Sequence, residues 1–146
     1  MKQLNHEIIQ TLKARGNLEP ERVAVKVNDT IFMCPTEVFK DFIIDCSESH
    51  WNKVEDWVNN KLIPYMTRKT INYKTSNSYG LKHTCEKEID EYTANIQIMY
   101  ILALRAIKTG KINNLQLYQT DFYYPLSSKF NKVRERPMYR PKFRIR

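Results

Sequence analysis

The side chains that could do chemistry in this 146-residue chain are three histidines, three cysteines and many basic residues. Cys46 and His50 are four residues apart, and His83 and Cys85 are two apart, so together they contain the ligand types of a zinc site. Neither pair has the usual C-x2-C or H-x3-H spacing, and Cys85 falls on an apolar stripe, where cysteine commonly packs as a small hydrophobe. We therefore expect no metal and no other cofactor.

The motifs of the common enzyme classes are also missing from the sequence. There is no glycine-rich phosphate loop, no G-x-S-x-G, no H-E-x-x-H and no zinc-deaminase signature. Two residues apart on a helix, the side chains of His83 and Cys85 point to different faces, so no direct activation of the thiol is expected. A small enzyme would need His50, His83 or Cys85, and we expect the protein not to be an enzyme.

The strongest signal is a concentration of positive charge at the C-terminus. Residues 129–146 carry eight basic side chains and one acid, a net charge of +7, whereas the whole chain carries +8 and residues 1–128 therefore only about +1. Such asymmetry favours attraction to phosphate or to an acidic protein surface. The expected nucleic-acid contacts from this arm are Lys129, Lys132, Arg134, Arg136, Arg140, Lys142, Arg144 and Arg146, with Tyr139 and Phe143 stacking on bases.

The arm is expected to be extended, and a second basic segment lies in the middle of the chain. Pro137 and Pro141 disfavour a helix and predict an extended arm, whose alternating end, residues 142–146, could also pair as an edge strand. The polar connector 67–77 adds Arg68, Lys69 and Lys74 as a second basic patch. Phosphate contacts of this kind position a nucleic acid and read little sequence.

Composition is typical of one folded domain. The apolar fraction is 42% and there are only three glycines, so we expect a single globular domain over residues 1–128 followed by the basic arm 129–146. The three cysteines are an odd number without close pairing, which favours reduced thiols in a cytoplasm. The longest apolar stretch, residues 98–104, is too short to cross a membrane.

Apolar spacing predicts a mainly helical α+β domain with four to five helices and a small antiparallel sheet. Residues 3–15 read as a helix, because Leu4, Ile8 and Leu12 recur every four residues, and residues 23–33 read as a hairpin turning at Asn28-Asp29. Further helices are expected after Thr36 and Ser49 as N-caps, and Trp51 and Trp57 are expected in the core.

The second half predicts two helices and one or two strands. A helix is expected from Ser78 and is interrupted at Asp90-Glu91. A second helix, capped by Thr93 or Asn95, is expected to run to about Lys108 and to be closed by Gly110. Helix, turn and helix could form a DNA-reading unit, but the second helix is apolar on most of its circumference and favours a core position. The residues that suggest strands completing the sheet are Leu115, Leu117, Phe122 and Tyr124.

One segment, residues 67–106, carries a recognisable motif. It consists of Lys69-Thr70-Ile71-Asn72, then Ser78-Tyr79-Gly80-Leu81-Lys82-His83, Glu86, Tyr92-Thr93 and Asn95. The pattern resembles one found in small proteins of bacterial phages and mobile elements: K-(I/F)-N, SYGLKH, a glutamate three residues on, and Y-(V/I/T)-(S/T)-N opening a helix. The family pattern tends to end that helix in a glycine-aromatic pair, which this chain lacks.

The resemblance implies a phage or mobile-element setting and no defined activity. Within the motif we expect structural roles: Ser78 as a helix cap, Gly80 permitting close approach, Leu81 in the core, and Lys82 with Glu86 as an exposed pair. The leading expectation for function is a non-enzymatic protein that binds nucleic acid or a nucleoprotein complex, with inhibition of a host defence nuclease, as by an anti-CRISPR protein, as one form.

The alternative is a virion or assembly protein whose arm binds neighbouring subunits. The expected partners are thus nucleic acid, a host defence protein or a virion subunit, and no membrane. The expected location is the bacterial cytoplasm or the virion. The sequence leaves the oligomeric state open.

Overall fold

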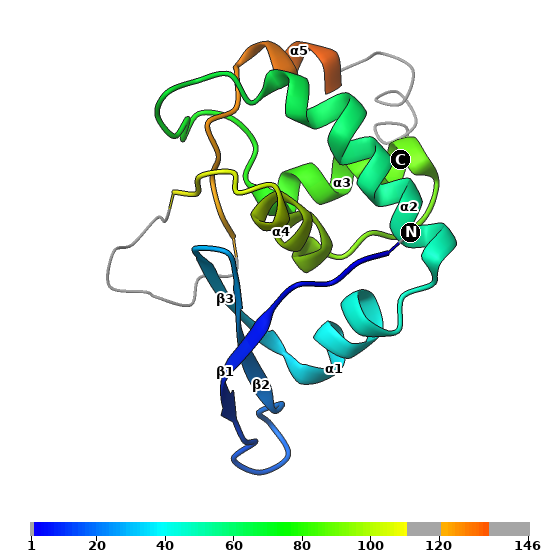
Figure 1. Cartoon of the computed structure of the whole chain (residues 1–146), viewed down its shortest axis with the longest axis vertical. Coiled ribbons are helices and arrows are strands. Elements are labelled where there is room, and N and C mark those ends of the chain that lie inside the picture. Colours follow the sequence, from blue (N-terminus) through cyan, green and yellow to red (C-terminus); the bar gives the residue numbers. More distant parts are fainter. Residues whose placement is uncertain (1, 111–120, 135–146) are drawn as a thin grey trace, which may run out of the picture.

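The computed structural model of the protein describes residues 2–110 and 121–134. These ranges contain five α-helices and a three-stranded antiparallel sheet, which confirms the predicted α+β fold with mainly helical content. Figure 1 shows the sheet at one end of the molecule and helices α2–α5 at the other.

The strands lie in the spatial order β1 (Glu7–Leu12), β2 (Arg22–Val27), β3 (Thr30–Pro35). The α-helices are α1 (Thr36–Phe39), α2 (Glu48–Trp57), α3 (Ser78–Ile89), α4 (Asn95–Leu104) and α5 (Lys129–Arg134). Two π-helical segments continue α1 and α2, namely η1 (Lys40–Ile44) and η2 (Val58–Leu62), and a 3-10 turn, η3 (Ile63–Tyr65), follows η2.

Strand β1 stands where the sequence predicted a helix over residues 3–15, so that prediction was wrong. β1 pairs antiparallel with β2, from Glu7 opposite Lys26 to Leu12 opposite Arg22, with a bulge between Ile8 and Gln10. Residues such as Ile8 and Ile9 favour extended backbone. Residues 7–12 therefore form a strand because they pair with β2, although their local four-residue repeat favours a helix.

The hairpin of β2 and β3 is confirmed. Val27 pairs with Thr30, so Asn28 and Asp29 form the turn, and Asn28 adopts a φ of 52°. Asparagine is one of the few residues that tolerate this left-handed conformation, which explains its place in a tight turn.

The helix starts differ from the predicted caps by one or two residues. Thr36 is the first residue of α1 and Pro35 occupies the N-cap, whereas the N-cap of α2 is Ser47, whose hydroxyl accepts from the His50 N–H, and not Ser49. In α3 the N-cap is Asn77, whose side chain accepts from the Gly80 N–H, and not Ser78. The helices themselves were predicted, and only the choice among neighbouring capping residues was wrong.

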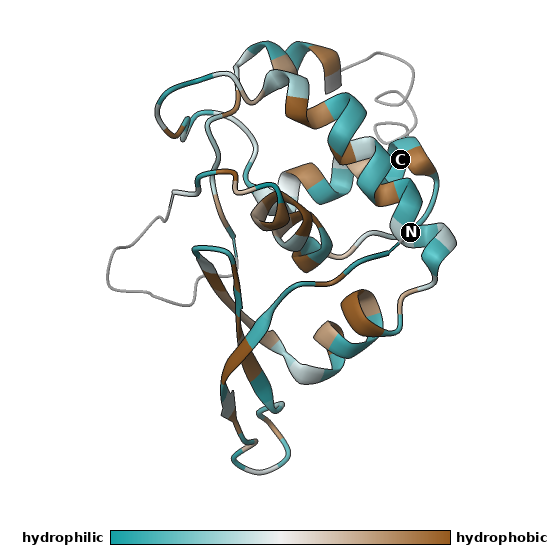
Figure 2. Ribbon diagram, in the orientation of Figure 1, coloured by the Kyte–Doolittle hydropathy of each residue, from teal (hydrophilic) through white to brown (hydrophobic). Residues whose placement is uncertain are grey.

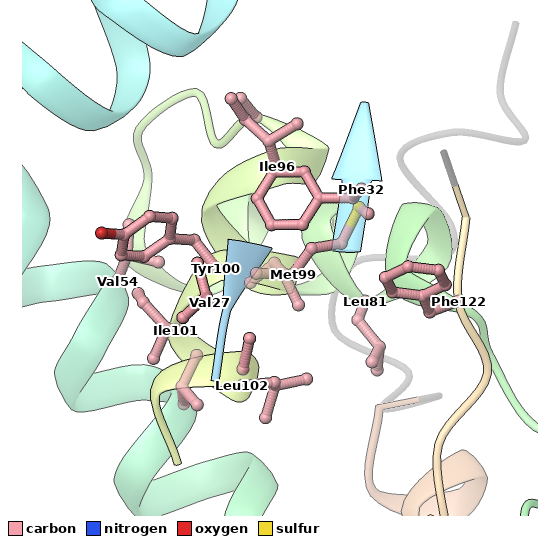
Figure 3. Close-up of a cluster of buried hydrophobic side chains, with 14 of the residues drawn as sticks. Val27, Phe32, Val54, Leu81, Ile96, Met99, Tyr100, Ile101, Leu102 and Phe122 are labelled. Carbon is pink, nitrogen blue, oxygen red and sulfur yellow. The ribbon is translucent and has the colours of Figure 1, made fainter. Parts of the chain in front are cut away.

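Helix α4 forms the centre of the core, as its sequence predicted. Eight successive residues, 96–103, are buried, and α4 contacts α2, α3, β2, η1 and η2. Figure 3 shows Val54, Leu81 and Phe122 converging on α4 with the hairpin residues Val27 and Phe32. Trp51 and Trp57 are also buried, which confirms their predicted place. Because α4 is covered on all sides, it cannot act as a groove-reading helix.

The ends of α4 differ from the prediction. Ala94 is its N-cap, and Gln97 accepts from the Ala94 N–H through Oε1, so neither Thr93 nor Asn95 is the cap. The helix ends at Leu104 and not near Lys108, because Ala106 turns into the left-handed region with a φ of 57°. Asp90, with a φ of 60°, closes α3 at the predicted interruption.

The last described segment, residues 121–128, does not complete the sheet of the hairpin. Phe122 and Tyr124 are buried as strand residues would be, but Tyr123 forms a single antiparallel bridge with Gly110. The predicted strand residues Leu115 and Leu117 lie outside the described residues. The segment runs instead along the connector 67–77, to which it is hydrogen-bonded.

Candidate nucleic-acid interface

The polar connector 67–77 contains no helix and no strand, as predicted, and its basic side chains are exposed. Arg68, Lys69 and Lys74 all lie on the surface, and the 17 residues 61–77 include four basic residues and no acid. Lys108, which follows α4, donates through Nζ to the Lys69 carbonyl at 2.8 Å. The connector therefore brings together cations from two parts of the chain.

Backbone hydrogen bonds hold this connector antiparallel to the segment that leads into α5. The Ser127 N–H donates to the Tyr65 carbonyl at 2.7 Å, and the Arg68 N–H donates to the Pro125 carbonyl at 3.1 Å. Further along, the Ser78 N–H donates to Phe122 at 2.8 Å. The connector and the start of the predicted arm are thus neighbours in space.

Asn72, the last residue of the motif segment Lys69-Thr70-Ile71-Asn72, links the connector to the segment that leads into α5. Its side chain is almost fully buried and donates through Nδ2 to the Leu126 carbonyl at 2.9 Å and to the Ser128 hydroxyl at 3.1 Å. Its own Oδ1 accepts from the Lys74 N–H. A buried amide satisfied in this way fixes both backbones, so Asn72 sets the distance between the connector and the root of the arm.

The first six residues of the predicted arm belong to the folded body. They form α5, and Phe130 is 2% exposed, with its ring edge-on to Trp57 at 6.3 Å and to Tyr65 at 5.7 Å. Residues 129–134 of the predicted arm are therefore helical, not extended, and they pack on the body. Phe130, an aromatic residue among basic ones, is the sequence feature that indicates packing on the body, and a count of charges does not register it.

The structure places only part of the predicted interface. Lys129 and Lys132 are exposed on α5, and Arg134 ends this helix. The other predicted contacts lie outside the described residues: Arg136, Tyr139, Arg140, Lys142, Phe143, Arg144 and Arg146. The described cations that gather beside the arm root are those of the connector, Lys108 and α5.

The SYGLKH part of the motif forms a separate cluster at α3 and the turn before α4. Lys82 is buried, with Nζ 3.3 Å from Glu86 Oε1, 4.4 Å from the centre of the Tyr92 ring and 5.6 Å from that of Tyr79. The predicted contact between Lys82 and Glu86 is confirmed, but its predicted exposure was wrong. The two tyrosines, both half exposed, cover the lysine and make cation–π contacts with it.

Glu86 is the centre of this cluster. Its Oε1 also accepts from the Thr93 N–H at 3.1 Å, and its Oε2 lies 3.0 Å from His83 Nδ1. Burial alone would raise the pKa of Glu86, but the Thr93 N–H, His83 and Lys82 together outweigh it and hold the pKa below its ordinary value. The carboxylate therefore ties the second half of α3 to the turn that precedes α4.

Two further motif residues have structural positions. Gly80 leaves room for Ser76, since a Cβ on it would lie 3.1 Å from the Ser76 Cβ, which confirms the expected close approach. Ser78 accepts from the Phe122 N–H at 3.1 Å through its hydroxyl, and so connects α3 to the arm-root segment and does not cap the helix. Leu81 is buried as expected.

The residues considered for metal binding or catalysis are placed in structural contacts. His50 Nδ1 lies 2.6 Å from Glu91, and His83 contacts Glu86. Cys85 is buried, and burial raises its pKa to about 12, so its thiol is a packing group and not a nucleophile. Among residues 2–110 and 121–134, no group of three or more His, Cys, Asp or Glu could hold a metal ion.

In the described part of the chain, no helix has the length and apolar character needed to cross a membrane. No protein-family model, curated protein or solved structure matches this chain.

Proposed function

We propose that the protein is a non-enzymatic binding protein of a phage or mobile element that engages nucleic acid or a nucleoprotein complex. The observation that carries the proposal is the pairing of the connector with the segment leading into α5, which gathers two basic sets, far apart in sequence, at one end of the fold. Phosphates follow one another along a strand, so a row of cations suits them better than a single charge.

The anchoring of α5 supports the same proposal. Phe130 fixes the root of the arm on Trp57 and Tyr65, beside the exposed connector. The five basic residues beyond Arg134 therefore follow a helix that is fixed on the folded body. A nucleic acid held by the connector would lie within reach of the arm, in the bacterial cytoplasm or in a virion. Inhibition of a host defence nuclease is one use of such binding.

The test measures binding to duplex DNA and to RNA over a salt series for three chains. One chain ends at Arg134, which keeps Phe130 in place while removing the five basic residues beyond it. A second carries Arg68→Ala, Lys69→Ala and Lys74→Ala. The matched control carries Lys13→Ala, Arg15→Ala and Lys26→Ala, three exposed cations at the sheet end of the molecule.

The proposal predicts a distinct salt dependence for each chain. Each lost phosphate contact lowers the slope of log affinity against log salt by about 0.9 on duplex DNA, so the slope should fall by up to about 4.5 for the shortened chain and by up to about 2.7 for the connector variant. The sheet-end control should keep the slope of the unaltered chain. If the unaltered chain binds neither DNA nor RNA at low salt, the proposal fails and the assembly function, with a protein partner for the arm, takes its place.

A further inference from the structure

Trp57 joins the root of the arm to an acidic surface. One edge of its indole contacts Phe130 of α5, and its Nε1 donates to Glu88 Oε1 of α3 at 2.9 Å. Glu91, in the turn after α3, contacts His50 and Lys53 of α2. The seam between α2 and α3 is therefore lined by carboxylates, and it begins at the residue on which α5 rests.

The charge of this surface is opposite to that of the arm. Residues 48–57 and 78–91 contain seven acids and three lysines, a net charge of −4. We define the acidic seam by Asp56 on α2, Glu88 on α3, and Asp90 and Glu91 in the turn after α3. Asp56, Glu88 and Asp90 are exposed. Lys53 lies at the same surface and is paired with Glu91, so it does not cancel the remaining carboxylates.

The distal arm, residues 135–146, has the charge and length to reach this seam. It contains five basic residues and one acid, a net charge of +4. Twelve residues span about 40 Å when extended, whereas α2, with ten residues, is about 15 Å long. Because the arm starts at the end of α5, which Phe130 holds on Trp57, its effective concentration at the seam is on the order of millimolar.

We propose that the distal arm docks on the acidic seam of its own chain and is released when nucleic acid binds. The carboxylates of Asp56, Glu88 and Asp90 then hold the arginines that would otherwise contact phosphate. Docking would reduce the apparent affinity for nucleic acid in proportion to the fraction of chains whose arm remains free. Salt would weaken both the contact of the arm with the seam and its contact with phosphate. The regulatory role rests on the proposed function, but the docking itself does not.

The docking is tested without nucleic acid, by the two tryptophan indole N–H signals in NMR spectra of the 15N-labelled protein. Trp57 touches the seam and the arm root, whereas Trp51 is fully buried in the core and serves as an internal control. At low salt, the Trp57 signal should differ between the full chain and the chain ending at Arg134, while the Trp51 signal stays in place. At about 1 M salt, where the Debye length is about 3 Å, the two Trp57 signals should converge.

Two charge variants make the test specific for the seam. The full chain with Asp56→Asn and Asp90→Asn keeps the Trp57–Glu88 hydrogen bond, and asparagine tolerates the φ of 60° at position 90. This variant should lose most of the Trp57 difference. The matched control, Glu37→Gln with Asp41→Asn, removes two exposed acids of α1 and η1 and should retain it.

Binding to nucleic acid gives the second readout. The seam variant should bind duplex DNA roughly threefold more tightly than the α1 control, which has the same net charge. Three results would overturn the proposal: a Trp57 signal unchanged by removal of the arm, an equal change at Trp51 and Trp57, or a difference that grows with protein concentration, which would assign the arm to a second copy. Loss of nucleic-acid binding with the indole result intact would remove the proposed function and leave the docking.

Discussion

Replacing Glu86 tests whether the SYGLKH cluster is a structural element of the fold. Glu86→Ala removes the acceptor of the N–H of Thr93, a fully buried residue. It also removes the carboxylate beside Lys82, whose side chain is only 8% exposed. An unsatisfied buried N–H costs about 1–3 kcal/mol. The tyrosine rings remain around Lys82 and limit the additional cost to about 1 kcal/mol. We expect a total loss of about 3 kcal/mol in the free energy of unfolding.

Two companion variants separate the hydrogen bond from the charge. Glu86→Gln keeps an oxygen for Thr93 and should cost only about 1 kcal/mol. Lys82→Met keeps an apolar side chain of similar size under Tyr92. It should lower the free energy of unfolding less than Glu86→Ala does, because Glu86 still has the Thr93 N–H and His83 as partners. Urea unfolding curves with unchanged slopes give these values.

The pH dependence provides an independent check of the same carboxylate. The pKa of Glu86 is lowered in the folded protein, so the unfolded chain takes up its proton at higher pH than the folded chain does. Its contribution to stability is therefore complete above the ordinary pKa of 4.5 and is lost as the pH falls towards the folded pKa. Glu86→Gln should show a shallower loss of stability over this range. A Glu86→Ala protein within about 0.5 kcal/mol of the unaltered chain would refute the structural role of the cluster.

Three further predictions concern other parts of the fold. Phe130→Ala should lower the free energy of unfolding by about 3–4 kcal/mol, and equal urea curves for Phe130→Ala and the unaltered chain would place α5 outside the core. Ending the chain at Arg134 should lower it by less than about 1 kcal/mol, because only the weak docking of the distal arm is lost. Ala106→Gly should stabilise the protein by about 1 kcal/mol, because alanine is strained at a φ of 57°, and a lower melting temperature would contradict this. Cys34 and Cys85, whose pKa values burial raises to about 12, should resist a thiol reagent at pH 8 in the folded protein, while Cys46, which is only partly buried, should react first; mass spectrometry of the labelled peptides measures the order.

The sequence predicted elements whose apolar pattern is strong and local. Helix α4 is an example, because an almost uninterrupted apolar run of ten residues has no stable place except a core. The hairpin is another, since alternation in β2 and the turn at Asn28 indicate the same structure. Both predictions depended on residues within one element, and both were confirmed.

The errors occurred where distant residues decide the structure. Leu4, Ile8 and Leu12 satisfy a helical repeat, but β1 pairs with β2 through backbone hydrogen bonds. Spacing within residues 4–12 cannot predict this pairing, because its partner strand lies elsewhere in the sequence. Likewise, the spacing of Lys82 and Glu86 predicted their contact on one helix face. That Tyr92, from the next turn, covers the lysine depends on the path of the chain between α3 and α4. The burial of Lys82 could not be read from spacing alone.

Net charge concealed the surface of the body in the same way. Residues 1–128 sum to about +1, yet the segments 48–57 and 78–91 carry −4, so the remaining residues of the body carry about +5. The near-neutral total is therefore the sum of an acidic surface along α2 and α3 and basic surfaces elsewhere, including the connector. The acidic seam and an external polyanion are therefore two electrostatic partners for one basic arm. Because salt weakens both, the affinity for nucleic acid should depend less steeply on salt than the number of arm cations suggests, until the acids of the seam are neutralised.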